Sequence, residues 1–205
     1  VQLIEMQMEN GAVTAPFLAE KIEKINMALS RMHRITSVLR NYCRNTEQDP
    51  LELVKLSSIM DETLGICSEK FSNRGVVLCL EPFQDQLIRC RGIQISQILI
   101  NILNNALDAM TEASFRKVLI KIRAEDRKVF ISVTNSGSSI PQNIRLNLFE
   151  PFFTPKQSGK GTGLGLSISR ALAREHGGDL SLDESQSSMT FVLTLQTESE
   201  TSAGG

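Results

Sequence analysis

The chain has 205 residues, of which 41% are hydrophobic and 22% are charged, and its net charge is −1. This balance is typical of globular proteins and excludes a disordered or fibrous chain. The near-neutral charge argues against a nucleic-acid partner, which would need a basic surface. No apolar stretch approaches the roughly 20 residues of a membrane span, so we expect no membrane contact. Because the chain begins at Val1 and has no signal peptide, we expect a fragment of a longer protein.

The first region, residues 1–45, carries a helical repeat. From Leu18 to Cys43, apolar or small residues recur in alternating steps of four and three, which is the period of a helix packed in a coiled coil or bundle. Residues 1–8 form a shorter apolar segment, and a break at 11–16 precedes the long helix. We expect this partial helical hairpin to dimerise with a second copy as a four-helix bundle, because its apolar stripe needs a partner. A helical arm packed on its own domain is the alternative.

Residues 46–196 alternate between helix and strand patterns after a polar linker that ends at Pro50. A capping pattern, Ser58-x-x-Asp61, marks the first helix start. The patterns predict helices at 58–71, 93–113 and 162–176, and strands at 76–80, 87–90, 118–123, 129–134, 180–182 and 189–195. We expect an α+β fold, a two-layer α/β sandwich whose mixed sheet carries helices on one face, followed by a disordered tail at 197–205.

The sequence contains four cysteines. No two of them have the C-x-x-C spacing of a zinc site, and each lies in an apolar segment. We therefore expect buried, reduced thiols and a cytoplasmic location, with a membrane anchor elsewhere in the full-length protein left open.

The helix expected at 93–113 carries a polar stripe on an otherwise apolar surface. Asn101, Asn105 and Asp108 are spaced at i, i+4 and i+7, which places them on one helical face. Such a set of oxygen ligands suits a Mg²⁺ ion that also keeps phosphate oxygens and water. A stripe that simply faces solvent is the alternative.

Two further segments follow the strand expected at 129–134. Asn135 and Gly137 stand at the strand end, where a polar side chain followed by glycine can hold the edge of a flat ligand. Residues 148–156 concentrate three phenylalanines and two prolines, which we interpret as the anchor of a hinged loop. Taken alone, each segment is equally explained as an ordinary turn.

A glycine-rich loop at residues 159–166 leads into the last expected helix. Its glycines let backbone N–H groups approach phosphate oxygens, and a helix N-terminus carries partial positive charge. Lys156 and Lys160 would add positive charges toward a γ-phosphate. The loop is not a Walker loop, because no Gly-Lys-Ser/Thr sequence ends it.

In this order and spacing, the four segments resemble the catalytic, ATP-binding domain of bacterial sensor histidine kinases, within the superfamily shared with the gyrase and MutL ATPases. The resemblance covers about residues 45–196 and implies the Bergerat ATP-binding fold, with ATP and Mg²⁺ as cofactors. Asn101, Asn105 and Asp108 match its N box, with Asn105 at the magnesium-ligand position, and residues 149–153 match its F box.

The resemblance also implies roles for individual residues. The positions implied for catalysis are Asn101, Asn105 and Lys160. Those implied for ATP binding are Asn105, Asp108, Asn135, Gly137, Ser139, Ile140, Lys156, Lys160, Gly161, Thr162, Gly163, Leu164, Gly165 and Leu166. Residues 154–161 would form a lid that orders on binding.

The G1 box departs from the family pattern Asp-x-Gly-x-Gly, in which the Asp accepts a hydrogen bond from the adenine amino group. Here the Asp position is Asn135 and the second Gly is Ser139. An Asn carbonyl oxygen can accept the same bond at a cost of ~1 kcal/mol, whereas a flipped amide would donate to a guanine carbonyl. We interpret adenine as the preferred base. The Cβ of Ser139 would crowd the nucleotide or strain the turn.

Neither histidine has the context of the family's phosphoacceptor, which lies on the first bundle helix and is followed by Glu or Asp. His33 lies on the second helix and is followed by Arg34, and His176 precedes Gly177 at a helix end, where a cation complements the helix dipole. We expect the acceptor box to have been removed with the preceding part of the protein.

The resemblance therefore implies the catalytic core of a two-component sensor histidine kinase. It would transfer the γ-phosphoryl group of Mg-ATP to a histidine, for relay to the receiver domain of a response regulator. Asn101 stands where water-activating relatives carry Glu, which disfavours hydrolysis. A degenerate scaffold with weak or no ATP binding, and an ATP-hydrolysing conformational clamp, are the alternatives.

Overall fold

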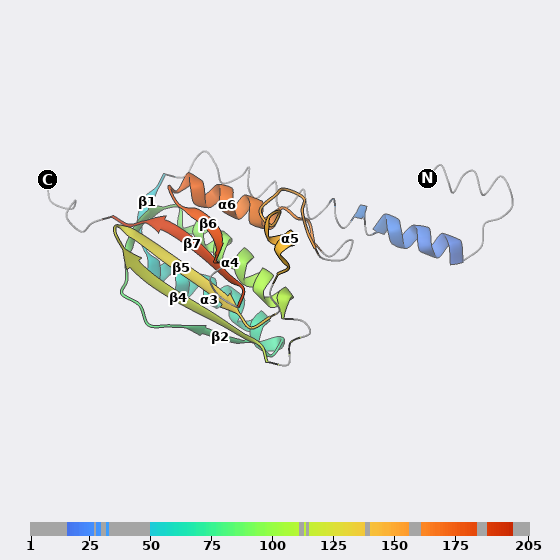
Figure 1. Ribbon diagram of the computed structural model, residues 1–205, viewed down its shortest axis with the longest axis horizontal. Coiled ribbons are helices and arrows are strands. Elements are labelled where there is room, and N and C mark those ends of the chain that lie inside the picture. Colours follow the sequence, from blue (N-terminus) through green and yellow to red (C-terminus); the bar gives the residue numbers. More distant parts are fainter. Residues whose placement is uncertain are drawn as a thin grey trace.

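The computed structural model describes residues 16–26, 28–29, 32, 50–110, 113, 115–137, 140–155, 161–183 and 188–198. Residues 16–26 and 28–29 are helical, in agreement with the apolar repeat (Figure 1). Their stripe residues Ile22, Ile25 and Leu29 are exposed. The expected helix end at 1–8, the remainder of the long helix beyond 32, and the expected tail beyond 198 lie outside the described residues.

Five strands form one mixed sheet in the order β2-β4-β5-β7-β6 (Figure 1). Their bounds are Val77–Leu80 for β2, Lys117–Glu125 for β4, Lys128–Asn135 for β5, Thr190–Gln196 for β7 and Asp179–Asp183 for β6. β2 runs parallel to β4, and the other neighbours are antiparallel. Asp126 and Arg127, with φ angles of 49° and 61°, form the tight turn between β4 and β5.

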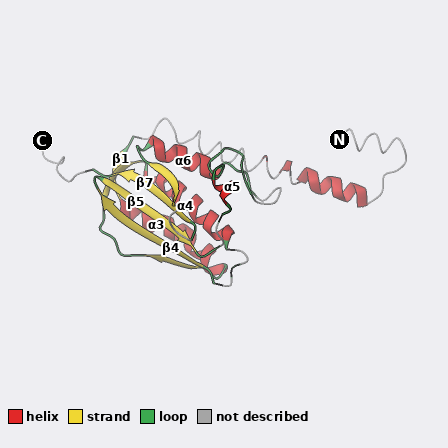
Figure 2. Cartoon of the chain, viewed as in Figure 1, coloured by secondary structure: helices red, strands yellow, loops and turns green. Residues whose placement is uncertain are grey.

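Three helices cover one face of this sheet: α3 (Leu56–Asn73), α4 (Gly92–Ala109) and α6 (Gly165–Glu175) (Figure 2). Alternate residues of β5 are buried beneath them, because successive strand residues point to opposite faces. α4 is the central helix, packed between α3 and α6, and it supplies the largest share of buried apolar side chains. The expected two-layer sandwich is confirmed.

β2 and β3 (Leu87–Cys90) are both strands, as predicted, but they do not pair with each other. β3 pairs antiparallel with β1 (Glu52–Lys55), and the two form a separate two-stranded sheet. β1 was not predicted, because it is short and mostly exposed and so has no alternating apolar pattern. β3 still contributes to the common core, since Ile88 and Cys90 are buried in it.

α3 begins at Leu56 rather than at the predicted capping pattern of Ser58. Its first turn is capped from the loop before β3 by Asp85, whose carboxylate oxygens accept hydrogen bonds from the Ser57 backbone N–H at 2.9 Å and the Ser57 hydroxyl at 2.7 Å. Burial raises the pKa of Asp85, but the hydrogen bonds from Ser57 and Gln86 outweigh it, so the pKa is lowered overall. Because Asp85 lies 28 residues after Ser57, no local sequence pattern predicts this cap.

The other helix bounds also differ from the prediction. α6 begins at Gly165 rather than at 162, because Gly163 has a φ of 69° and cannot continue a right-handed helix. α4 ends at Ala109 rather than at residue 113, because the next residue, Met110, does not have a helical backbone conformation. A short helix, α5 (Gln142–Arg145), was not predicted.

Candidate nucleotide-binding site

The polar residues that were predicted to share one face of α4 do not all face the same neighbouring helix. Asn101 faces α6, where its Nδ2 donates a hydrogen bond to Ser169 Oγ at 2.9 Å. Asp108 faces α3 and forms an ion pair with Arg74 at 3.5 Å, which is exposed and therefore weak. Asn105 lies half-buried on the same helical face. Asn101 and Asp108 thus contact different neighbouring helices.

The start of α6 leaves its first turn open. Among the described residues, no side-chain hydrogen bond caps the helix at the N-cap residue Leu164, and no acidic residue lies in its first turn. Thr162 Oγ1 accepts a hydrogen bond from the Leu164 N–H at 3.3 Å, which holds the preceding loop against the helix. Since first-turn N–H groups have no intrahelical acceptor, this end of α6 can bind an anion such as phosphate.

Two glycines allow the loop before α6 to touch segments that are distant in sequence. A Cβ on Gly163 would lie 2.3 Å from the carbonyl carbon of Phe152, and a Cβ on Gly165 would lie 2.5 Å from Asn101 Oδ1. Phe152 itself has a φ of 67°, a left-handed conformation that costs a bulky residue about 1–2 kcal/mol. Three of the predicted motifs therefore meet at one place, and backbone strain is concentrated there.

Asn135 ends β5 and is 1% exposed. Its Oδ1 accepts a hydrogen bond from the Gly137 N–H at 2.8 Å. Gly137 lies against the end of α4, because a Cβ there would come within 2.5 Å of the Ala109 carbonyl oxygen. Within the part of the chain that the structure describes, Nδ2 of Asn135 has no hydrogen-bond partner. A buried donor without a partner is rare in folded proteins.

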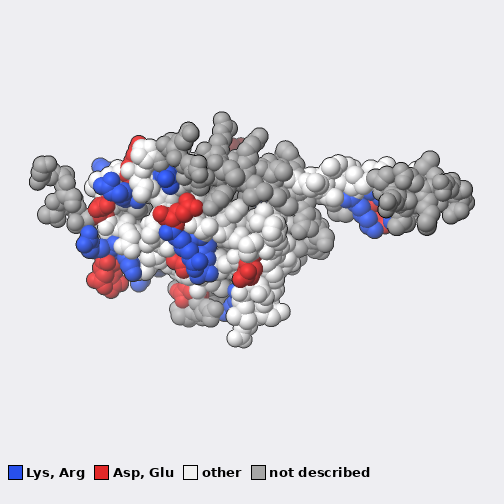
Figure 3. Space-filling model, turned by 90° about the horizontal axis from the view of Figure 1, so that it is seen from above, with Lys and Arg blue, Asp and Glu red and all other residues white. Residues whose placement is uncertain are grey.

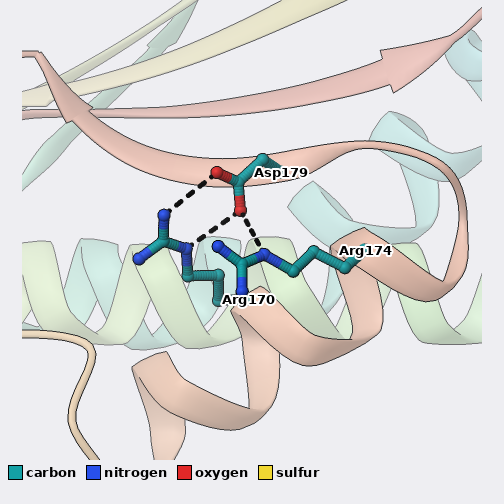
Figure 4. A network of polar contacts seen from close by, with 3 residues as sticks. All are labelled: Arg170, Arg174 and Asp179. Atoms are coloured by element: carbon teal, nitrogen blue, oxygen red, sulfur yellow. Dashed lines mark hydrogen bonds and ion pairs between the residues drawn. The ribbon is translucent and has the colours of Figure 1, made fainter.

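The predicted anchor segment is held by contacts from α6. The guanidinium of Arg170 lies 4.8 Å from the ring centroid of Phe149, and Phe149 packs edge-to-face on Phe191. Arg170 Nε and Nη2 donate to the two carboxylate oxygens of Asp179 at 2.9 and 3.1 Å, and Arg174 Nε donates to the same group at 3.1 Å (Figure 4). These contacts show that Phe149 is packed, and the interpretation of residues 148–156 as the anchor of a hinged loop stays a prediction.

Sequence reasoning missed this cluster of Arg170, Arg174 and Asp179. The signal was present, since two arginines four residues apart lie on one helical face, but their acidic partner follows the helix and is joined only by the fold. The hydrogen bond from Arg170 is the main reason that the pKa of Asp179 is lowered. The same bond raises the pKa of Arg170.

His176 has the structural role that was expected, but as a neutral ring rather than a cation. Its Nδ1 donates to the Leu172 carbonyl oxygen at 2.8 Å, and its Nε2 accepts a hydrogen bond from the Arg91 backbone N–H at 3.2 Å. A protonated Nε2 could not accept that bond. The ring joins the end of α6 to the start of α4. His33 lies outside the described residues.

Several predicted site residues are not described by the structure, namely Ser139, Lys156 and Lys160 together with most of the expected lid at 154–161. Their roles stay predictions. Ile140 is described; it packs at the edge of the core, and its carbonyl oxygen accepts a hydrogen bond from Arg145 Nε at 2.7 Å. Gly161 and Leu166 are half-buried on either side of the open helix start.

The three described cysteines are free thiols, and Cys67 and Cys90 are buried as expected, whereas Cys79 is half-buried. Burial raises the pKa of the Cys90 thiol to about 11, so this group is un-ionised at neutral pH. The fourth, Cys43, lies outside the described residues.

Charge is mixed on the face of the molecule that Figure 3 shows. Figure 3 shows basic and acidic side chains side by side rather than a patch of one sign. Among the described residues, no group of three or more His, Cys, Asp or Glu side chains could hold a metal ion. None of the described helices has the length and apolarity needed to cross a bilayer.

Comparisons with known proteins agree with this geometry. Residues 90–199 match the family described as Histidine kinase-, DNA gyrase B-, and HSP90-like ATPase. Among curated proteins, the two-component sensor PprA of Pseudomonas aeruginosa is 31% identical over 98% of this chain, and the chain spans 22% of that protein's length.

Two solved structures of the histidine kinase ThkA are also similar. Its nucleotide-free catalytic domain matches 71% of this chain and 96% of that one, with 31% identity and a TM-score of 0.63. The structure of ThkA in complex with the response regulator protein TrrA matches 95% of this chain and 56% of that one, with 28% identity and a TM-score of 0.66.

Proposed function

Since this chain belongs to the family of histidine kinase-, DNA gyrase B- and HSP90-like ATPases, as the catalytic domain of a sensor histidine kinase, we propose that it binds Mg-ATP and transfers the γ-phosphoryl group to a histidine. One observation carries the proposal: Asn101 of α4, Phe152 and the loop at Gly163 and Gly165 meet beside an open helix N-terminus. That position suits a triphosphate, because the glycines permit close backbone approach and the helix end favours negative charge.

Each predicted residue has a role in this proposal. Asn105 would hold Mg²⁺ on the triphosphate, and Asn135 would contact the base from the end of β5. The N-terminus of α6, with Lys156, Lys160 and residues 161–166, would bind the phosphates. Catalysis would consist mainly of positioning and charge neutralisation, as in other phosphoryl transfers.

Transfer to an imidazole is favoured over hydrolysis. Asn101 has no basic carboxylate that could activate water, and its amide is engaged with Ser169 of α6. We propose that the acceptor histidine belongs to a part of the protein outside this chain. An ATP-hydrolysing conformational clamp would need a base that activates water, and Asn101 does not supply one.

The proposal extends to domain organisation and partners. Residues 1–45 would be a partial dimerisation and phosphotransfer hairpin, and residues 46–196 the catalytic domain. The exposed apolar stripe at Ile22, Ile25 and Leu29 supports pairing with a second copy. The similarity to ThkA, whose structure holds the response regulator protein TrrA, supports a response regulator as the partner. A cytoplasmic location is part of the same proposal.

Calorimetric titration of the chain with ATP tests the proposal, with and without Mg²⁺. We expect magnesium-dependent binding that is lost in Asn105→Ala. The matched control is Asn104→Ala, which removes a neighbouring amide that faces Lys70 of α3 and should leave binding unchanged. Equal loss in both variants would contradict the role of Asn105. No binding of any purine nucleotide up to millimolar concentration would favour the degenerate scaffold.

A further inference from the structure

Arg170 is a residue of α6 whose guanidinium contacts two other segments at once. Its Nε and Nη2 donate to the two carboxylate oxygens of Asp179 on β6 at 2.9 and 3.1 Å (Figure 4). Its Cζ atom lies 4.8 Å from the ring centroid of Phe149. A planar, delocalised cation can serve a carboxylate and an aromatic ring at the same time. Arg170 therefore joins α6 both to β6 and to the segment that contains Phe149.

The segment at residues 149–153 contacts the chain around α6 at a second point. The Phe153 N–H donates to the Glu150 carbonyl oxygen at 3.2 Å, which closes a turn. The backbone of Phe152 in this turn lies so close to Gly163 that a Cβ there would come within 2.3 Å of the Phe152 carbonyl carbon. This turn is therefore held at one point by the middle of α6 and at another by the loop that precedes the helix.

The turn is strained at Phe152, and the side chain of this residue does not account for the strain. Phe152 has a φ of 67°, a left-handed conformation that bulky residues avoid. Its side chain is 60% exposed, so burial of the ring contributes little. A strained backbone persists where the surrounding contacts determine it. Three residues earlier, Phe149 supplies such contacts, since it packs edge-to-face on Phe191 and lies beneath the guanidinium of Arg170.

We propose that Arg170 is a positioning residue for nucleotide binding: through the ring of Phe149 it holds residues 149–153 against the glycine-containing loop that precedes α6. The inference rests on the proposed function, because it takes that loop to bind the triphosphate. Without the contact on Phe149, the strained turn relaxes in the free protein, and nucleotide binding has to restore it. Restoring a conformation on binding lowers the observed affinity. Arg170 thus acts through Phe149 and not by touching the nucleotide.

Arg174 provides a matched control on the same helix. Its Nε donates to the same Asp179 carboxylate at 3.1 Å. Within the described part of the chain, the cation that lies over the Phe149 ring is Arg170. Arg174→Ala therefore weakens the contact between α6 and β6 but leaves the contact on Phe149 in place.

Dissociation constants for Mg-ATP, measured by calorimetry, test the inference. We expect Arg170→Ala to bind about fivefold more weakly than the wild-type chain, and Arg174→Ala to stay within about twofold. Phe149→Leu keeps an apolar side chain but removes the ring, and should show a loss similar to that of Arg170→Ala. The double variant should lose no more than either single variant, because both substitutions break the same contact.

Urea denaturation accompanies each titration, since a change in stability alone does not alter the dissociation constant of a variant that stays folded. If Arg170→Ala does not fold, as judged by circular dichroism, the same cycle with Phe149→Leu is measured with Arg170→Met. That variant keeps an apolar stem over the ring and removes the charge.

The possible outcomes separate the inference from the function on which it rests. Wild-type affinity in Arg170→Ala, or losses that add in the double variant, overturn the inference and leave the proposed function standing. An equal loss in Arg174→Ala also overturns it, because the contact between α6 and β6 would then be what positions the loop. No binding of Mg-ATP by the wild-type chain overturns both.

Discussion

The two ends of the α4–α6 helix pair differ in the hydrogen bonding of their polar side chains and in their backbone conformation. At one end, His176 joins α6 to the start of α4 with both ring nitrogens bonded. At the other end, Phe152 has a left-handed backbone, and Gly163 and Gly165 lie in close contact with other segments. Among the described residues there, Nδ2 of Asn135 has no hydrogen-bond partner.

From this difference we expect the His176 end of the helix pair to contribute to stability and the opposite end to contribute to ligand binding. The His176 end resembles ordinary core in that both ring nitrogens of His176 are hydrogen-bonded, and its left-handed backbone position is a glycine, Gly177, which adopts that conformation without strain. The opposite end carries strain and an unpaired donor, which folded proteins tolerate chiefly where a ligand binds. Substitutions at the His176 end should therefore change stability, and comparable substitutions at the other end should change binding.

The largest effect is expected for Gly178→Ala at the His176 end. A Cβ at Gly178 would lie 1.8 Å from the Thr194 carbonyl oxygen, so backbone atoms of β7 would have to move. We expect a loss of about 3–4 kcal/mol in the free energy of unfolding, measured by urea denaturation.

Gly65→Ala is the matched control for this substitution, because no atom lies within 4 Å of the new Cβ. Its position inside α3 favours alanine, so we expect a gain of about 0.5–1 kcal/mol. Equal stability of the two variants would show that the contact between Gly178 and β7 is not tight.

His176→Ala should have the next largest effect. It leaves the Arg91 N–H without its acceptor and opens a small cavity between α6 and α4, which we expect to cost about 2–3 kcal/mol in urea denaturation. Nucleotide affinity should stay within about twofold of wild type. Arg174→Ala, a surface control nearby, should cost less than about 1 kcal/mol. A large loss of affinity in His176→Ala would mean that the two ends are not independent.

Gly163→Ala tests the opposite end with a steric conflict of the same kind. The new Cβ would meet the backbone of Phe152 at 2.3 Å, in a residue whose φ of 69° already disfavours alanine. The conflict lies in a loop, so we expect at most about 1–2 kcal/mol of destabilisation but at least about tenfold weaker nucleotide binding by calorimetry. Unchanged binding would remove this loop from the site.

The smallest effect concerns pH and the pair formed by Arg170 and Asp179. The pKa of Asp179 is lowered in the folded chain, so its contribution is fully present above about pH 4 and is lost as the pH falls further. The carboxylate is substantially exposed, so we expect less than about 1 kcal/mol. Stability measured from pH 2.5 to 7 should lose part of its acid dependence in Asp179→Asn. If Asp179→Asn lost as much stability at acidic pH as the wild type does, the prediction would be contradicted.

Local patterns in the sequence determined much of this molecule. Period-two alternation located β4, β5 and β7 to within two residues, because a half-buried strand must alternate. The glycine-rich loop and the stripe that contains Asn105 were recognisable because their chemistry depends on residue type and short-range spacing. These features predicted the fold class, which the structure confirms, and a nucleotide site, which stays a prediction.

Contacts between distant segments were decided only by the tertiary structure. The pairing of β3 with β1, the cap that Asp85 places on α3 and the bond from Asn101 to Ser169 each join residues far apart in the chain. So does the packing of Gly137 on Ala109, which helps to hold the Asn135 amide in one orientation. Residue type showed that Asn135 could either accept or donate; the tertiary structure decided that its Oδ1 accepts from the Gly137 N–H in a turn held against α4.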